Sequence, residues 1–236
     1  MLSDVMEDYL KAIYTLQSKH GPPVSTSDIA DYLDKTPPTV TSMLGKLEER
    51  GLVDREKYKG VELTREGETV ALEVLRHHRL LEAYLTEHLD YSWSEVHEEA
   101  DRLEHHISEE FERRVADLLG NPTVDPHGDP IPGADLEPLG HDDTTPLSDH
   151  AVGDRVVVAR VSDRDEEELE YLEAAGVVPG TTLDVVDVAP FGMVTVRAVG
   201  EEHEQSLPDA VAASIRVSDA VDEHGEESTP TEVNGA

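Results

Sequence analysis

The stretch STSDIADYLDKTPPTVTSMLGKLEERG, residues 25–51, decides the fold of the N-terminal part of the chain. Its first part predicts a short helix over residues 28–33, and a tight connection of three residues follows. Pro37 suits the first turn of a second helix, because no backbone N–H is needed for hydrogen bonding there. The second helix should end at Gly51, since glycine is common just beyond a helix C-terminus. Two helices joined by a three-residue turn are typical of a helix-turn-helix.

The segments on either side of this stretch extend the motif. Apolar residues at helical spacing predict a helix over residues 4–19. Residues 52–56 and 60–64 have the composition of two short strands, which would form a β-hairpin wing with a basic tip. Such a tip is placed to contact phosphate, and small hydroxyl side chains early in the second helix fit a DNA groove. The predicted DNA-facing residues are Thr36, Pro38, Thr39, Thr41, Ser42, Lys46, Lys57 and Lys59.

Beyond the wing, the pattern predicts helices and then strands. Helices are expected over residues 65–89, 95–106 and 109–119, and they hold more leucine than they need for their own packing. We expect this excess to form a homodimer interface. Several short segments of β composition, separated by turns, predict a small C-terminal β-barrel. These segments are residues 154–160, 182–188, 193–198 and 215–217.

The predicted fold class is therefore α+β, in five parts. An N-terminal winged helix-turn-helix occupies residues 1–65, and an all-α dimerisation and metal-binding domain occupies residues 66–140. A linker over residues 141–150 continues a stretch rich in Pro, Gly and Asp. The small barrel spans residues 151–218, and an acidic tail, residues 219–236, should be disordered.

The composition of the chain limits the classes of protein to which it can belong. The chain has 236 residues, no cysteine and a formal net charge of -34, so disulfides and thiolate ligands are excluded. Residues 1–65 are nearly neutral, with 9 Lys or Arg against 11 Asp or Glu, which keeps DNA binding compatible with an acidic chain. The acidic remainder, poor in lysine, predicts a protein from a halophile. No apolar run is long enough for a membrane span and no signal peptide is evident, so we expect a cytoplasmic protein without a membrane partner.

A second stretch, VHEEADRLEHH at residues 96–106, carries potential metal ligands. At about 100° per residue, four of its side chains would fall within an arc of roughly 100° on a helix. They are His97, Asp101, Glu104 and His105. His78 and Glu82 lie four positions apart on the preceding predicted helix and would share a face. Because imidazole and carboxylate groups bind divalent metals, the sequence predicts a metal site between two helices.

These features combine with other segments into a specific set of motifs. The segments are MEDYLKAIY (6–14), PPTVT (37–41), RHHRLLE (76–82), VHEEADRLEHH (96–106) and HGDPIPG (127–133). Together they resemble the diphtheria toxin repressor and manganese transport regulator family of metal-dependent transcriptional repressors. The predicted barrel is similar to the SH3-like, FeoA-type module of the longer members, so the resemblance covers about residues 3–218.

The resemblance implies a function. It implies a repressor, not an enzyme, that senses Mn(II) or Fe(II), takes no small organic substrate and controls metal-uptake genes. A metal ion would join the first helix to the dimerisation helices, and the metal-loaded homodimer would bind a palindromic operator of double-stranded DNA. The implied primary site is Asp8, Asp101, Glu104 and His105, and the implied second site is His78, Glu82 and His97. The barrel of longer members can add two ligands, which here would be Asp165 and Glu168.

Two departures from the family pattern bear on the metal. Lys11 stands where the manganese-selective branch has a further carboxylate, which argues against a binuclear manganese site of that kind. Asp8 and Asp101 stand where the iron-selective branch has Met and Cys. Carboxylates in place of sulfur favour the harder ion Mn(II), although Fe(II) is also compatible with imidazole and carboxylate ligands. We therefore expect manganese, with iron as the alternative.

Other classes also fit parts of the pattern. A binuclear metallohydrolase would use the same histidines and acids, but the chain has no HExxH or nucleophile motif. A metal-independent winged-helix regulator of the MarR type would leave the acids solvated. A small helical domain without DNA would use the prolines only to start a helix. DNA binding without metal would favour the MarR-type alternative.

Overall fold

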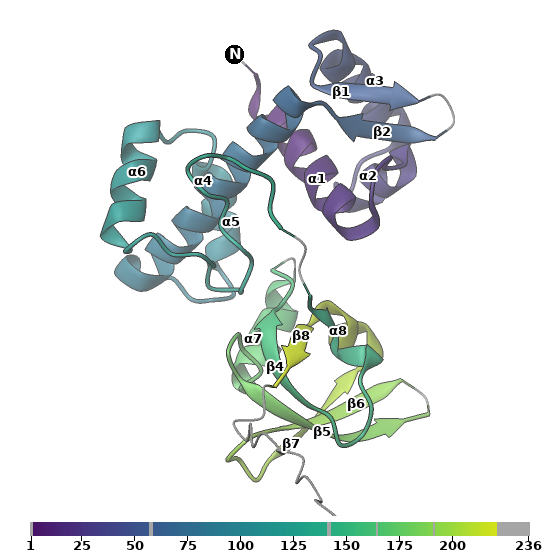
Figure 1. Ribbon diagram of the computed structural model, residues 1–236, viewed down its shortest axis with the longest axis vertical. Coiled ribbons are helices and arrows are strands. Elements are labelled where there is room, and N and C mark those ends of the chain that lie inside the picture. The colour runs from purple at the N-terminus through teal and green to yellow at the C-terminus, as the bar shows by residue number, and fades with distance from the viewer. Residues whose placement is uncertain (1, 57–58, 141–142, 164, 191, 221–236) are drawn as a thin grey trace, which may run out of the picture. The chain divides into compact units, whose positions relative to one another are not determined.

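A computed structural model describes residues 2–56, 59–140, 143–163, 165–190 and 192–220 (Figure 1). The chain divides into two compact units. The first unit contains Met1–Asp142 and Val161–Ala174, and the second contains Asp143–Arg160 and Ala175–Ala236. The predicted C-terminal domain is thus interrupted, because the segment after its first long strand belongs to the first unit.

The first unit begins with a winged helix-turn-helix. Its elements are α1 (Asp4–His20), α2 (Thr26–Tyr32), α3 (Pro37–Glu49), β1 (Val53–Glu56) and β2 (Gly60–Leu63). The hydroxyl of Ser25 accepts a hydrogen bond from the Asp28 N–H and caps α2. Pro37 starts α3, and Gly51 follows it with a φ of 72°. The two strands pair antiparallel, so the predicted helices and wing strands are confirmed.

The long helix α4 (Arg65–Leu89) connects the wing to the two shorter helices that follow it. Its start is fixed by a close backbone approach, because a Cβ on Gly67 would lie 1.9 Å from the Leu52 carbonyl oxygen. A glycine that weakens local helix preference is therefore required here. Farther along, α4 takes part in successive apolar cores. Its buried leucines are Leu72 and Leu75 in the winged-helix core, and Leu80, Leu81 and Leu85 beyond it.

Two shorter helices pack on the second half of α4. They are α5 (Val96–Leu103) and α6 (Glu109–Leu118), and Ser108 caps α6. Helix α5 ends earlier than predicted, because its chain tightens into a turn in which the His106 N–H donates to the Leu103 carbonyl. Glu104 and His105 consequently lie in the turn after α5. The segment Val161–Ala174, with α7 (Glu166–Ala174), completes this unit.

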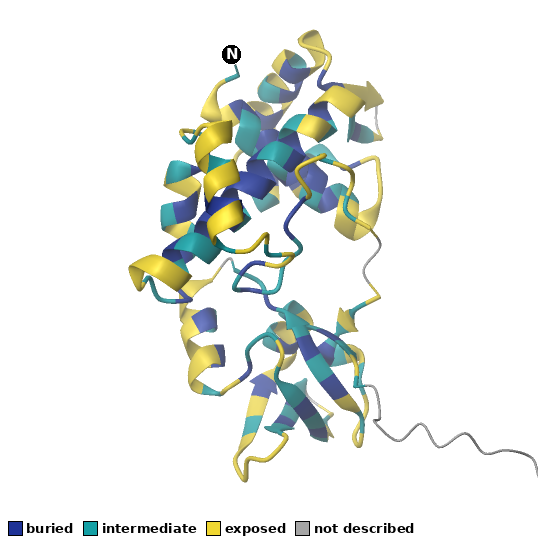
Figure 2. Ribbon diagram, turned by 60° about the vertical axis from the view of Figure 1, so that its left-hand side comes forward, coloured by how far each residue is buried: buried dark blue, intermediate teal, exposed yellow. Residues whose placement is uncertain are grey.

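The second unit is an antiparallel sheet with the strand order β3-β8-β4-β5-β6-β7. Its elements are β3 (Thr145–Pro146), η1 (Leu147–Asp149), β4 (Arg155–Arg160), β5 (Thr182–Ala189), β6 (Met193–Ala198), β7 (Glu204–Pro208), α8 (Asp209–Ser214) and β8 (Arg216–Asp219). Buried residues alternate along β4 and β6 (Figure 2), as expected for strands with one face in a core. β3 and β7 are the two edge strands of this sheet, and among the described residues they do not pair with each other. The predicted closed barrel is therefore not evident.

The second unit differs from the sequence prediction at its ends. β3 and η1 lie within residues 141–150, predicted as a linker, because Leu147 is fully buried and holds this segment against the sheet. β7 and α8 were not predicted, since their sequence is mostly polar or small. Of the tail predicted at 219–236, all but the first two residues lie outside the described part of the chain. No helix among the described residues is long and apolar enough to cross a membrane.

Candidate metal centre

The first cluster, defined as Asp8, Asp101, Glu104 and His105, joins α1 to the end of α5. His105 Nε2 lies 2.9 Å from Asp8 Oδ1 and 3.3 Å from Glu104 Oε1. Ligand atoms of Asp8, Glu104 and His105 all lie within 4.8 Å of one another, and Glu104 is buried. Asp101 belongs to an adjacent trio with Glu104 and His78. The structure thus brings together the four predicted primary ligands, in two overlapping groups.

Two residues not predicted as ligands complete the surroundings of the first cluster. Glu7 Oε2 lies 2.8 Å from His105 Nδ1, on the ring side away from Asp8, and orients the imidazole. The hydrogen bond to Asp8 raises the pKa of His105 to about 9, against a smaller effect of burial. The ammonium of Lys11 donates to both Asp101 and Glu104. The ammonium of Lys11 and the imidazole of His105 are therefore the basic partners of these acids.

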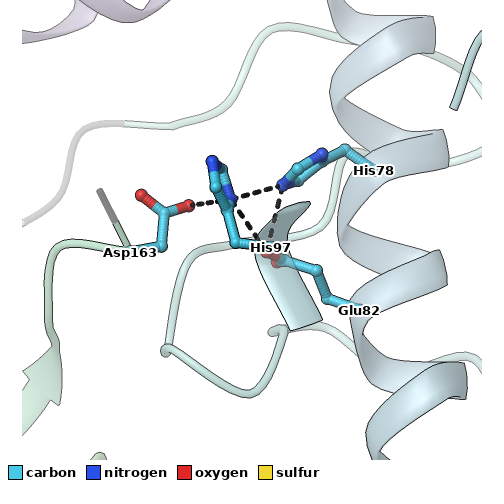
Figure 3. Close-up of side chains that lie close together, drawn as sticks. All are labelled: His78, Glu82, His97 and Asp163. Atoms are coloured by element: carbon cyan, nitrogen blue, oxygen red, sulfur yellow. Dashed lines mark hydrogen bonds and ion pairs between the residues drawn. The ribbon is translucent and has the colours of Figure 1, made fainter. Parts of the chain in front are cut away.

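The second cluster, defined as His78, Glu82, His97 and Asp163, lies between α4 and α5 (Figure 3). His78 Nε2 lies 3.0 Å from both Glu82 Oε1 and His97 Nδ1. His97 Nδ1 is also 3.2 Å from Glu82 Oε1 and 3.2 Å from Asp163 Oδ2. The i and i+4 placement of His78 and Glu82 on α4 is the predicted one. Three predicted ligands and one further carboxylate therefore converge.

Charges in the second cluster are strongly coupled. Burial, the largest single influence, lowers the pKa of His78, but the charge of Glu82 and the hydrogen bonds to Asp101 and Glu104 together raise it well above its usual value. Burial also lowers the pKa of His97, yet hydrogen bonds to Asp163 and Glu82 raise that pKa to about 10. For Asp163 the directions are reversed. Burial raises its pKa, but the hydrogen bond and the charge of His97 lower that pKa to about 2. A metal ion binding here must displace protons from imidazole.

A third group lies against the second cluster and shares Glu82 with it. Glu82, Asp125 and His127 are all buried, and their ligand atoms lie within 4.8 Å of one another. His127 Nε2 donates to the Trp93 carbonyl at 2.8 Å, which fixes the ring and turns Nδ1 towards Glu82. Glu82 Oε2 and His127 Nδ1 lack hydrogen-bond partners and lie 3.6 Å apart. Buried polar atoms rarely lack a hydrogen-bond partner. A carboxylate oxygen and an imidazole nitrogen in this position fit as ligands of a bound cation.

Asp165 and Glu168, predicted as further ligands, are not brought into these clusters. Asp165 is exposed, and its Oδ1 accepts the Glu168 N–H at the start of α7. Asp163, two positions earlier in the same acidic run, faces His97 instead. Sequence could not distinguish these acids, because the choice depends on the turn between β4 and α7. His127 was marked only by the HGDPIPG motif, which gave no indication that its ring faces Glu82.

Most of the predicted DNA-facing side chains are exposed in the winged helix-turn-helix. Thr36, Pro38, Thr39, Thr41, Ser42, Lys46 and Lys59 are all exposed. The hydroxyls of Thr36 and Thr39 lie 2.9 Å apart, and Thr41 donates to the Pro37 carbonyl. Lys59 pairs with Glu56 in the wing at 2.6 Å. Lys57 lies outside the described residues.

A winged helix-turn-helix in the same compact unit as clusters of imidazole and carboxylate groups defines the class of protein: a metal-responsive, DNA-binding regulator. Family models give the particular family. Residues 1–61 match "Iron dependent repressor, N-terminal DNA binding domain", residues 64–133 match "Iron dependent repressor, metal binding and dimerisation domain", and residues 145–219 match "FeoA domain". The chain belongs to the iron-dependent repressor family of metal-dependent transcriptional repressors.

Individual relatives agree with this assignment. The iron-dependent repressor IdeR of Mycobacterium tuberculosis is 36% identical over 228 residues, covering 92% of this chain and 97% of that protein. The diphtheria toxin repressor of Corynebacterium efficiens is 34% identical over 227 residues, covering 92% and 96%. A solved structure described as a manganese-dependent transcriptional repressor in complex with manganese has a TM-score of 0.84 and 37% identity, covering 91% and 100%. The family consists of repressors, not enzymes, so the metallohydrolase alternative is not supported.

Proposed function

We propose that this chain represses metal-uptake genes by binding a palindromic operator as a homodimer loaded with Mn(II) or Fe(II). The contact between His105 and Asp8 carries the proposal, because it joins residues 97 positions apart in the sequence. Asp8 is part of the winged helix and His105 follows α5, so ligands from both parts surround one point. Whatever occupies that point fixes the DNA-binding end against the dimerisation helices.

The residues of the first cluster would hold one ion. Asp8, Asp101 and Glu104 repel one another, and a bound divalent cation would supply the positive charge that keeps them close. His105 would lose its proton and contribute Nε2, while Glu7 keeps the ring oriented through Nδ1. Asp8 would then tie α1 to the turn after α5. Metal affinity becomes DNA affinity by linkage, since both favour the same arrangement.

The second cluster would hold another ion through His78, Glu82 and His97. We propose Asp163 as its ligand from the 161–174 segment, in preference to the predicted Asp165 and Glu168, because Asp163 contacts His97 directly. Asp125 and His127 extend this site through Glu82. Between the two candidate ions we favour manganese, since no donor in either cluster is sulfur.

The proposal extends to the rest of the chain. The DNA-facing surface would be Thr36, Pro38, Thr39, Thr41, Ser42, Lys46, Lys57 and Lys59, with lysines on phosphate and the α3 side chains in the major groove. The C-terminal sheet would form an SH3-like barrel. The protein would act in a cytoplasm of high salt, where counterion release contributes less to DNA affinity and direct contacts contribute more.

The test is selection of an operator followed by a metal series. Mn(II)-loaded protein selects duplexes from a random pool, and the selected duplex is used in shift assays in 2 M KCl with EDTA or with Mn(II), Fe(II), Co(II) or Zn(II). We expect a shift with Mn(II) or Fe(II) and none with EDTA. Asp8→Ala and Glu104→Ala should remove the metal-dependent shift while sedimentation still shows a dimer. Equal binding in EDTA would favour the metal-independent MarR type instead.

A further inference from the structure

His77 is a buried histidine that belongs to neither cluster. It precedes the proposed ligand His78 on α4, and only 8% of its surface is exposed. Its Nδ1 lies 3.0 Å from the backbone carbonyl oxygen of Glu104. A carbonyl oxygen can only accept a hydrogen bond, so Nδ1 carries the proton and donates it. His77 therefore binds the main chain of a residue whose side chain belongs to the first cluster.

This contact lies at the point where α5 ends. The last carbonyl groups of a helix have no partner within the helix. Glu104 directly follows α5 and is buried. A buried carbonyl group without a partner destabilises the folded chain, and the Nδ1–H of His77 supplies the missing hydrogen bond. The turn that contains Glu104 and His105 is thereby fixed at its first residue.

Glu104 is held at two points by consecutive residues of α4. His77 binds its carbonyl oxygen, and His78 Nδ1 lies 2.6 Å from its Oε2. Consecutive side chains leave a helix about 100° apart, so the two imidazoles approach Glu104 from different directions. The hydrogen bond to the carbonyl uses neither carboxylate oxygen. It can therefore persist when the carboxylate binds an ion.

The other side of the His77 ring faces α6. Its Nε2 lies 3.4 Å from Glu112 Oε2, and Glu112 Oε1 accepts a hydrogen bond of 2.5 Å from Arg76 Nε. Arg76 also donates to the Pro132 carbonyl at 2.6 Å. The carboxylate of Glu112 therefore joins α6 to two neighbouring residues of α4. Contacts to α4 thus flank the turn, residues 104–108, that separates α5 from α6.

We propose that His77 is a positioning residue of the first cluster, which holds the turn after α5 so that Glu104 and His105 are in place before a metal ion binds. The inference rests on the proposed function, since it assumes an ion at the first cluster. His105 follows Glu104 directly, so a shift of the Glu104 carbonyl moves both proposed ligands. Without His77 the turn would have to be ordered at the moment of binding, and such ordering lowers affinity.

The variants that test this role differ in where they place a hydrogen-bond donor. The amide nitrogen of asparagine is bonded to Cγ, as Nδ1 is in histidine, so His77→Asn keeps a donor for the Glu104 carbonyl. His77→Gln places its amide one carbon farther out, near the position of Nε2. His77→Leu removes both nitrogens. His106→Leu changes an exposed histidine of the same turn and is the matched control.

The measurement is isothermal titration with Mn(II) in two backgrounds. His97→Gln weakens the second cluster and leaves the first to be measured, and Asp8→Ala does the reverse. We expect His77→Leu and His77→Gln to weaken binding at the first cluster by about tenfold or more, the size typical of residues that orient a metal ligand. His77→Asn and His106→Leu should bind nearly as well as the wild type. Binding at the second cluster should be unchanged in all four variants.

Three results would overturn the inference. They are unchanged Mn(II) affinity in His77→Leu, equal losses in His77→Asn and His77→Gln, and a loss at both clusters, which would indicate a general effect on packing. The comparison of His77→Asn with His77→Gln decides the point even if His77→Leu does not fold. If Asp8→Ala alone binds as many Mn(II) ions as the wild type, the first cluster binds no ion, and the proposed function fails as well.

Discussion

The two ring nitrogens of His78 contact different clusters. Its Nδ1 lies 2.6 Å from Glu104, and its Nε2 lies 3.0 Å from Glu82. A neutral imidazole carries a proton on only one of these nitrogens, so the acid on one side influences the ligand available on the other. The two proposed metal sites consequently share a residue and should not titrate independently.

Trp93 offers a direct reporter of the second cluster. It is the only tryptophan in the chain, and its ring centroid lies 5.3 Å from that of His127. Mn(II) or Co(II) held by Glu82 and its neighbours should quench Trp93 fluorescence, because paramagnetic ions quench at short range. We expect strong quenching in the wild type and in Asp8→Ala, and weak quenching in His97→Gln. Equal quenching in His97→Gln would place the ion elsewhere.

The histidine pKa values predict how the metal-free protein responds to pH. The pKa is about 10 for His97 and about 9 for His105 in the folded chain, against about 6.5 in an unfolded one. The folded state therefore binds more protons between pH 6.5 and 10, and its stability must fall as pH rises through this window. Below pH 6.5 this contribution is fully present.

The measurement is the Tm in EDTA from pH 6 to pH 10. The wild type should lose Tm steadily above pH 7, and His97→Gln should lose less. Saturating Mn(II) should reverse the trend, since the ion competes with protons and binds better as pH rises. A metal-free Tm that rises between pH 7 and pH 10 would contradict the charge network described for His97 and Asp163.

At the scale of elements, α4 shows what local sequence can and cannot predict. Its helical pattern was predicted from the sequence, but no local pattern accounts for the glycine at position 67 in its first turn. The structure shows that Gly67 allows α4 to approach the backbone of Leu52. A contact between residues that are distant in the sequence leaves no local pattern. The contact between Asp163 and His97 is another such case.

Substituting the two helical glycines should therefore give opposite results. Gly67→Ala gains helix preference but places Cβ against the Leu52 carbonyl, so we expect a net loss of roughly 1–3 kcal/mol. Gly45→Ala is the matched control in α3, where an added Cβ meets nothing within 4 Å. It should stabilise the chain by about 0.5–1 kcal/mol. Urea denaturation measures both, and a stabilising Gly67→Ala would show that the wing loop yields easily.

The strands show a different limit. β4, β5 and β6 were predicted from alternating or β-branched residues, and their burial confirms that pattern. β3 and β7 are edge strands whose residues need few apolar contacts, so β3 fell within the predicted linker and β7 was not predicted. Helix α4, which carries the candidate ligands His78 and Glu82, has the predicted bounds, because its apolar residues repeat at helical spacing within one element.

At the scale of the whole molecule, the charge of -34 dominates. Self-repulsion of this size destabilises the compact state, and salt reduces it by shortening the Debye length from about 10 Å at 0.1 M to about 3 Å at 1 M. We expect the Tm of the metal-free protein to rise markedly between 0.1 and 2 M KCl. Glycine betaine at equal osmolality is the control, since it carries no net charge. A Tm that responds equally to both would remove the basis for a halophilic assignment.

The length of α4 has a mechanical consequence. The helix of 25 residues begins against the wing and carries His78 and Glu82 near its middle. At 1.5 Å per residue it spans roughly 37 Å, and the ligands lie about 20 Å from its first turn. A stiff rod pivoting by about 5° at the ligands would move that turn by about 2 Å, which is enough to change how α3 fits a groove. In the proposed function α4 would therefore act as a lever, since a small displacement among the proposed ligands would produce a larger one at the DNA-binding end.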